Sequence, residues 1–407
     1  MSGLKRLSHN LFCIVSLGLV LWLSFLPEPI NSRYAGIILA VFCVALTVSF
    51  LADKRRVTGI SRDKIGFLPI IYTLYLAVFI SCPEEFNIYM RLILPGPILY
   101  YLFKNEFLFV KNKDHFFIVI VACAVPVALI GILESYFKIN ILYEIFASNI
   151  LYKFFNSTGR AMSTQGIPHV FATYLGVCLV LSYHLISKSS NLLNRLIAII
   201  CSLSLMGGII VSGTRGLFLA LVISSCLYFV IKGKKVGFTV VILILTLIIL
   251  FAKPAMRSQV LHRFTLSGLT SGEVFRDRAD RYNVAIKMSA AHPIKGVGLG
   301  NHRFFYETYK NEERPVYGRT PDNMYLLILA ESGIVGLALF LSFALLLLAK
   351  AAKYIKSNDI VLALTGGIVV ILLAMLDYDA LYWPAPFYMF WILSGMLVSV
   401  AQERTDE

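Results

Sequence analysis

Long apolar segments follow one another along most of this chain, each close to the roughly 17–25 residues that a helix needs to cross a bilayer. Backbone groups inside a bilayer must bond to one another, so such segments fold as helices. The sequence predicts about twelve spans, at residues 11–27, 34–52, 66–82, 87–103, 116–133, 170–187, 195–212, 216–232, 237–252, 322–349, 360–377 and 386–401. With 58% hydrophobic and only 15% charged residues, the predicted fold is an all-α polytopic membrane protein.

The short connections between these segments alternate in charge. If the N-terminus lies inside the cell, the connections on that side are basic, as at residues 54–64 and 232–235. The opposite turns at 83–85 and 377–379 contain acidic residues and no Lys or Arg. Because basic residues collect in cytoplasmic loops, this topology is favoured, and it places the long loops 134–169 and 253–321 on the outer face.

The net charge of +14 does not indicate a nucleic-acid-binding protein. The basic residues form short groups between apolar runs, and no nucleic-acid-binding motif is present. They fit cytoplasmic loops together with an anionic substrate. The seven cysteines are scattered singly, without CxxC spacing, so we expect them to pack as small apolar side chains. No metal and no cofactor are predicted.

The loop 253–321 divides the chain into an N-terminal transmembrane bundle (1–252), the loop itself with short helices, and a C-terminal bundle (322–407). It contains twelve Lys and Arg against six Asp and Glu, with Arg276, Arg278 and Arg281 close together. The residues after them, 282–288, are predicted to continue as an amphipathic helix. Arg side chains bind phosphate oxygens through paired hydrogen bonds. The loop therefore suits an anionic lipid-linked substrate, with general attraction to lipid headgroups as the alternative.

Two further positions carry charge at the ends of apolar segments. Arg215 lies in the tight turn 212–216, where a cation is costly unless it pairs or faces a polar cavity, and this makes it a functional candidate. The alternative is an Arg that extends to the headgroups. Asp322 and Asn323 begin the segment after Pro321, and Asp322 fits either a helix N-cap or a carboxylate base.

The remaining candidates are titratable or follow a glycine-rich turn. Glu331 lies inside an apolar helix, and we expect one of the outer arginines to pair with it. His169 and His302 are candidates that each fit a structural role equally well. The stretch 296–301 lacks the Lys-Ser/Thr of a nucleotide loop, so it is predicted to form a tight turn that brings His302 and Arg303 beside the bilayer.

Several of these stretches together resemble the O-antigen ligase/polymerase family of bacterial integral-membrane glycosyltransferases, which are GT-C-like. The matching stretches are SGTRG (212–216), HPIKGVGLGN (292–301) with an Arg shortly before it, DNMYLLILAESGIVG (322–336) and, less closely, GRAMSTQGIPHVFATYL (159–175). Members of the family transfer a glycan from undecaprenyl diphosphate to an acceptor hydroxyl at the periplasmic face of the inner membrane. The resemblance implies a metal-independent, inverting glycosyltransferase.

The resemblance also implies roles for individual residues. Arg215 and Arg281 would hold the diphosphate and stabilise the charge of the leaving group, with Arg160 assisting. Asp322 would accept the proton of the acceptor hydroxyl, although the family usually has His there, and a carboxylate with an ordinary pKa of about 4 is a weaker base. Further substrate contacts are expected from Arg276, Arg278, His169, His302, Arg303, Asn323 and Glu331.

The implied partners are an undecaprenyl-diphosphate-linked oligosaccharide, an acceptor glycan and membrane lipids, with a chain-length regulator left open. The Asp at 322 favours a polymerase, whose acceptor is another lipid-linked repeat unit, over a ligase, whose acceptor is the lipid A core. Two alternatives come from other classes. The first is a transporter or flippase of lipid-linked oligosaccharide, which should have charges at mid-membrane depth within broken helices. The second is a non-catalytic scaffold for a cell-envelope complex.

Overall fold

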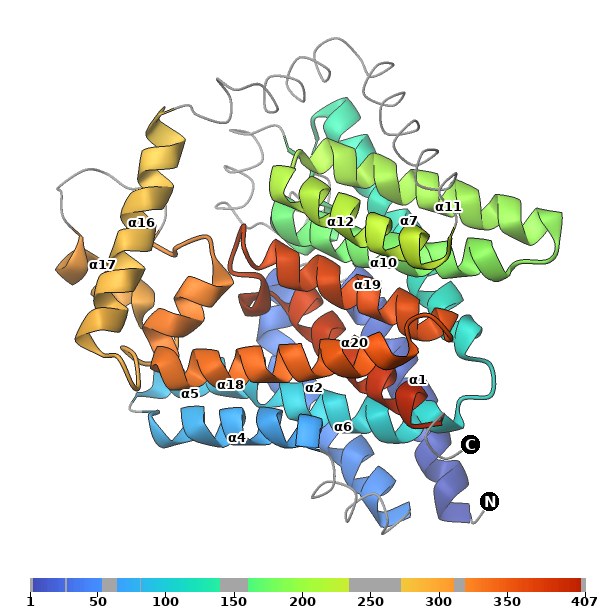
Figure 1. The fold of residues 1–407 in the computed structure, drawn as a ribbon, viewed down its shortest axis with the longest axis horizontal. Coiled ribbons are helices and arrows are strands. Elements are labelled where there is room, and N and C mark those ends of the chain that lie inside the picture. The colour runs from blue at the N-terminus through green and yellow to red at the C-terminus, as the bar shows by residue number, and fades with distance from the viewer. Residues whose placement is uncertain are drawn as a thin grey trace.

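The computed structural model describes residues 3–25, 28–52, 64–80, 82–139, 160–233, 272–310 and 319–403. Within these ranges the chain is helical and contains no strand, so the all-α prediction is confirmed (Figure 1). The longer helices are α1 (Gly3–Phe25), α2 (Glu28–Ala52), α4 (Lys64–Val78), α6 (Pro95–Glu106), α7 (Lys113–Phe137), α10 (Pro168–Lys188), α11 (Leu192–Ser212), α12 (Arg215–Ile231), α16 (Gly272–Ala291), α18 (Met324–Tyr354), α19 (Asp359–Ala374) and α20 (Pro384–Glu403).

The predicted spans coincide with these helices, except that residues 237–252 lie outside the described part. Six described helices are long and apolar enough to cross a membrane: α1, α7, α10, α11, α18 and α20. The number of crossings stays a prediction. The span predicted at 87–103 is interrupted, since α5 (Pro83–Ile88) passes through a π-helical turn, Tyr89–Ile93, before α6 begins.

Asparagine side chains begin several of the helices. The Oδ1 atoms of Asn112, Asn191 and Asn358 accept hydrogen bonds from backbone N–H groups in the first turns of α7, α11 and α19. Each bond satisfies a donor that the helix itself leaves unpaired, which stabilises a helix end by about 1 kcal/mol. The short polar connections between apolar segments therefore also set where the helices start.

Helices α10 and α20 lie at the centre of the bundle (Figure 1). Nearly all of the side chains in their most apolar stretches are buried, whereas α7, α11 and α18 expose apolar faces. Those faces suit contact with lipid tails, which are as apolar as the side chains themselves. Around α20 the packing is aromatic, and the rings of Phe343 and Trp391 stack with centroids 5.1 Å apart.

Helix α18 is broken at Gly333, whose φ of 66° and ψ of −170° lie outside the helical region. The loop that follows α16 supplies partners for the groups at the break: Ile334 N–H donates to the carbonyl of Pro293 at 2.8 Å. Val297 N–H in turn donates to the carbonyl of Ala330 at 2.9 Å. The predicted tight turn at 296–301 is thus confirmed, and backbone hydrogen bonds fix it against a membrane helix.

Helices α16 and α17 (His302–Tyr309) lie together at one end of the molecule, beside the start of α18 (Figure 1). The amphipathic helix predicted at 282–288 is confirmed as part of α16. Its apolar side chains Val284, Ala285 and Met288 are buried against Tyr306 and Ala330. This packing holds the charged first half of α16 over the end of the bundle.

Candidate functional site

A cluster of charged side chains forms where α16 meets the segment before α18. Arg281 on α16 is only 7% exposed. Its Nη1 lies 2.8 Å from Asp322 Oδ2 and donates to the carbonyl of Thr320 at 2.9 Å, while Nη2 lies 3.1 Å from Asp277 Oδ2. Charge-assisted bonds from a rigid guanidinium are strong and directional. Arg281 is therefore held in one orientation before any substrate arrives.

Arg278 extends the cluster to the turn between α19 and α20. Its Nη1 lies 2.9 Å from Asp377 Oδ1, and its Nε lies 3.8 Å from Asp322 Oδ2. The other oxygen of Asp377 is 3.7 Å from Nε2 of His169, at the start of α10. Burial alone would lower the pKa of Arg278, but the contact with Asp377 outweighs it and raises that pKa. Arg278 therefore stays charged.

The turn 212–216 packs directly against Asp377. A Cβ atom added at Gly216 would lie 2.5 Å from the carboxyl carbon of Asp377, so only glycine allows this approach. Arg215, the first residue of α12, interacts electrostatically with Asp377 and Arg278. Arg160 donates from Nε to the carbonyl of Ser212 at 2.7 Å and also acts on Asp377. Arginines from three separate segments therefore meet around one aspartate.

Asp322 does not cap α18, so that reading of the sequence is wrong. Asn323 is the cap, with its Oδ1 accepting from Leu326 N–H at 3.1 Å. Asp322 itself has a φ of 44°, a left-handed conformation that costs a non-glycine residue about 1 kcal/mol or more. That conformation directs its carboxylate to Arg281, and strain of this kind often occurs at functional sites.

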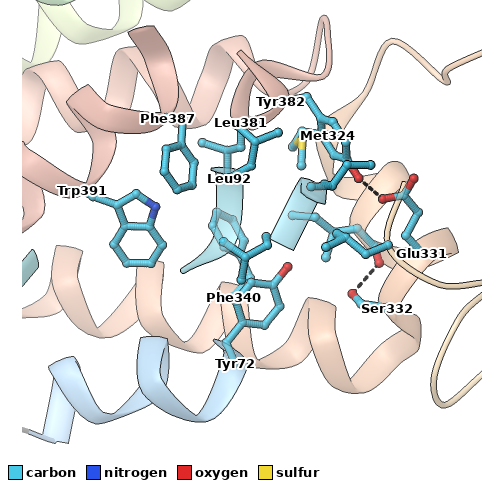
Figure 2. A pocket seen from close by; sticks show the side chains of 14 residues that line it. Tyr72, Leu92, Met324, Glu331, Ser332, Phe340, Leu381, Tyr382, Phe387 and Trp391 are labelled. Carbon is cyan, nitrogen blue, oxygen red and sulfur yellow. Dashed lines mark hydrogen bonds between the residues drawn. The ribbon is translucent and has the colours of Figure 1, made fainter. Parts of the chain in front are cut away.

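Among the residues that the structure describes, Glu331 forms no ion pair with an arginine; the side chain of Arg276 lies outside that part, so the predicted ion pair stays a prediction. The carboxylate of Glu331 accepts a hydrogen bond from the hydroxyl of Tyr382, as Figure 2 shows, and Oε1 lies 3.4 Å from the backbone nitrogen of His302. Burial raises the pKa of Tyr382 well above its usual range, so the phenol remains the donor. A neutral donor from the turn between α19 and α20 therefore bonds to this buried carboxylate.

His302 and Arg303 lie on the other side of residues 319–320 from Arg281. His302 is fully buried, and its Nδ1 lies 2.8 Å from the carbonyl oxygen of Arg319. Burial lowers the pKa of this imidazole to about 4. Arg303 is exposed, with its guanidinium carbon 4.9 Å from the centre of the Phe304 ring. These two residues border a cavity next to the arginine cluster rather than joining the cluster.

The structure therefore brings together most, but not all, of the predicted residues. Arg276 belongs to α16, but its side chain lies outside the described part. Sequence reasoning missed Asp277 and Asp377 as partners of the arginines. The sequence contains a signal for Asp377, which together with Asp379 flanks Tyr378 in a turn between two apolar segments. A carboxylate buried beside membrane helices needs a cation as its partner. Within the described residues, no group of three or more His, Cys, Asp or Glu could hold a metal ion.

Comparison with known proteins gives one finding that bears on this site. Residues 197–341 match a family model described as O-antigen ligase. The matched region contains the turn 212–216, α16, α17 and the start of α18, and so includes Arg215, Arg281 and Asp322. Arg160, His169 and Asp377 lie outside it. A search of curated proteins finds no match.

Proposed function

Because residues 197–341 match a family model described as O-antigen ligase, we propose that this chain is a member of the O-antigen ligase/polymerase family and that it transfers a glycan from undecaprenyl diphosphate to an acceptor hydroxyl at the periplasmic membrane face. The polymerase form of the reaction, with a second lipid-linked repeat unit as acceptor, is preferred. Ligation to the lipid A core is the alternative. Both use the same site, and they differ in the acceptor that reaches it.

The observation that carries this proposal is the fixed pair of guanidinium groups on α16. Arg278 forms an ion pair with Asp377, and Arg281 forms one with Asp322. Arg215 interacts electrostatically with Arg278 and Asp377. Glycan transfer breaks the bond between the anomeric carbon and a diphosphate oxygen, and the electron pair leaves with the diphosphate. Preorganised cations stabilise that developing charge without reorganising during the reaction, which is often the largest contribution to catalysis.

Asp322 is the proposed base. The acceptor oxygen forms the new bond to the anomeric carbon from the face opposite the diphosphate, which inverts the configuration, and its proton passes to the carboxylate. Because Asp322 Oδ2 also contacts Arg281 at 2.8 Å, one residue pair would serve both the leaving group and the nucleophile. No step of this scheme uses a metal.

One feature of the structure supports the transporter alternative, and others argue against it. Helix α18 is broken, as transporters of this kind require. However, the backbone groups at the break bond to the loop at 293–297 rather than facing an open path. The arginines that suit a diphosphate lie on α16, which is not one of the candidate membrane-crossing helices, and at the first residue of α12. This arrangement favours a reaction at the membrane surface.

The test is glycan profiling of a deletion strain complemented with wild type, Arg281→Ala or Asp322→Asn, at matched levels of membrane protein. Lys295→Ala, an exposed cation in the same loop, is the control and should behave as wild type. We expect both site variants to lower transfer about a hundredfold or more. Single repeat units on the surface lipid would indicate a polymerase, and long chains left on the carrier would indicate a ligase. Unchanged profiles for both variants would refute the proposed site.

A further inference from the structure

A cavity of about 240 Å³ lies between the π-helical turn Tyr89–Ile93, the start of α17 and the start of α18. The polar residues that line it are Arg91, His302, Arg303, Thr320, Glu331, Asp379 and Tyr382. A volume below the roughly 300–1,000 Å³ of pockets for drug-sized ligands suits a single ring-sized unit. The proposed transfer reaction does not assign any role to this cavity.

His302 presents an unused hydrogen-bond acceptor at this cavity. The carbonyl of Arg319 can only accept, so Nδ1 of His302 carries the proton and donates to it. With a pKa of about 4 the ring is neutral at neutral pH, which leaves a lone pair on Nε2. That atom is buried and has no hydrogen-bond partner among the described residues. A buried polar atom of this kind needs an explanation, and a ligand hydroxyl would provide one.

Arg91 presents the complementary donor. It lies in the π-helical turn, a type of irregularity often found at functional sites. Its Nε is buried and likewise has no hydrogen-bond partner within the part of the chain that the structure describes. A guanidinium has only donors, so Arg91 and His302 together offer one donor and one acceptor, which is the combination that a hydroxyl satisfies.

The cavity lining contains charged groups of both signs. Arg91 and Arg303 are cations, whereas Asp379 and Glu331 are carboxylic acids. Burial and the nearby Asp322 raise the pKa of Asp379 to about 6, so this group is still mostly ionised at neutral pH. The arginine cluster suits phosphate, but this mixed lining does not favour an anion.

We propose that the cavity binds an uncharged, hydroxyl-rich sugar unit, with one hydroxyl donating to Nε2 of His302 and accepting from Arg91. This inference rests on the proposed function, because it places the sugar beside the arginine cluster. Thr320 separates the two regions: it lines the cavity, and its carbonyl accepts from Arg281. The unit is either the acceptor sugar or the first sugar of the donor, and both have the same chemistry.

Beside the Glu331–Tyr382 pair, a second, mostly apolar cavity extends toward Phe387 and Trp391, as Figure 2 shows. Glu331 and Tyr382 line both cavities. The hydrogen-bonded pair therefore lies between the two cavities. The unpartnered atoms that the proposal uses, Nε2 of His302 and Nε of Arg91, belong to residues that line the polar cavity.

The experiment uses the full-length protein in nanodiscs and a panel of methyl glycosides observed by saturation-transfer NMR. His302→Asn keeps a donor at the Nδ1 position and removes the Nε2 acceptor, whereas His302→Gln places an acceptor near Nε2. His292→Asn, at an exposed His at the end of α16, is the matched control. We expect His302→Asn and Arg91→Gln each to weaken glycoside binding about tenfold, and His302→Gln by less than about threefold.

Steady-state kinetics then distinguish the two sources of the sugar. A rise in KM for the acceptor alone in His302→Asn assigns the cavity to the acceptor, and a rise for the donor alone assigns it to the donor sugar. The proposal is overturned if folded His302→Asn and Arg91→Gln bind glycosides as wild type does, or if inorganic diphosphate competes there and glycosides do not bind. Glycoside binding that depends on His302 in a protein without transferase activity would refute the proposed function and leave the cavity assignment intact.

Discussion

Arg281 on α16 and Asp322 ahead of α18 form an ion pair with Nη1 and Oδ2 2.8 Å apart, although α17 lies between them in the chain. The pair joins the helix of the outer loop to the beginning of a membrane helix. Since Arg281 is almost fully buried, the pair is shielded from solvent on one side. The geometry of the arginine cluster therefore depends on a contact that also stabilises the loop.

A double-mutant cycle with Arg281→Gln and Asp322→Asn should give a coupling energy of about 1–3 kcal/mol in unfolding of the detergent-solubilised protein. Removing one partner leaves a largely buried charge with fewer bonds, which costs more than losing an exposed pair. The control cycle uses Lys310 and Glu307, a pair at the end of α17 whose side chains are 27% and 50% exposed, where the coupling should stay below about 1 kcal/mol. Equal coupling energies in both cycles would show that the burial of Arg281 does not strengthen its interaction with Asp322.

Gly216→Ala should lower glycan transfer at least about tenfold. The new methyl group would lie 2.5 Å from the carboxyl group of Asp377 and must push it away from Arg278. Overpacking of this kind typically also costs about 1–3 kcal/mol of stability. Gly18→Ala in α1 meets no atom within 4 Å, so it should leave transfer unchanged. If both alanine variants are as active as wild type, the position of Asp377 does not matter for the reaction.

Gly333→Ala should destabilise the protein more than Gly233→Ala does, by about 2 kcal/mol or more. Both glycines have φ near +65°, so alanine strains the backbone at each position. At Gly333 the ψ of −170° adds to that strain, because this region is essentially restricted to glycine. Only at Gly333 would the Cβ atom meet another group, the carbonyl oxygen of Ile294 at 2.0 Å, whereas Gly233 faces open space. Thermal unfolding in matched detergent measures the difference. Similar losses of stability for the two variants would mean that the loop at 293–297 can move away from the break in α18 at little cost in free energy.

His302 should make stability fall as the pH is lowered. Its pKa is about 4 in the folded protein, against about 6.5 when unfolded, so the unfolded chain binds more protons between these values. Between pH 7 and pH 5 this should cost about 2 kcal/mol. Asp379, whose pKa is raised to about 6, acts in the opposite direction, because its folded form binds more protons.

The measurement therefore compares wild type with His302→Gln over that pH range. Asp379 affects both proteins alike, so the difference isolates the histidine. The stability of wild type relative to the variant should drop by about 2 kcal/mol from pH 7 to pH 5. A constant difference would show that His302 titrates normally and is not held neutral.

Much of the fold follows from local properties of the chain. The lengths of the apolar segments predict most of the helices, because a backbone in a bilayer must form its own hydrogen bonds. The amphipathic helix at 282–288 and the tight turn at 296–301 are likewise properties of adjacent residues. Arg215 and Asp322 are identifiable as candidates, since charges at the ends of apolar segments are costly and seldom without purpose. Arg281 is identifiable from the basic composition of the loop 253–321.

Which charge pairs with which was decided by the tertiary structure alone. The sequence suggested an arginine for Glu331, but among the described residues its side-chain partner is Tyr382, from the turn between α19 and α20. It suggested a cap at Asp322, but Asn323 caps the helix and leaves Asp322 to Arg281. Segment length and hydrophobic pattern act between neighbours in the chain and can be read directly. Ion pairs and buried hydrogen bonds join distant segments, so their partners emerge only when the helices pack.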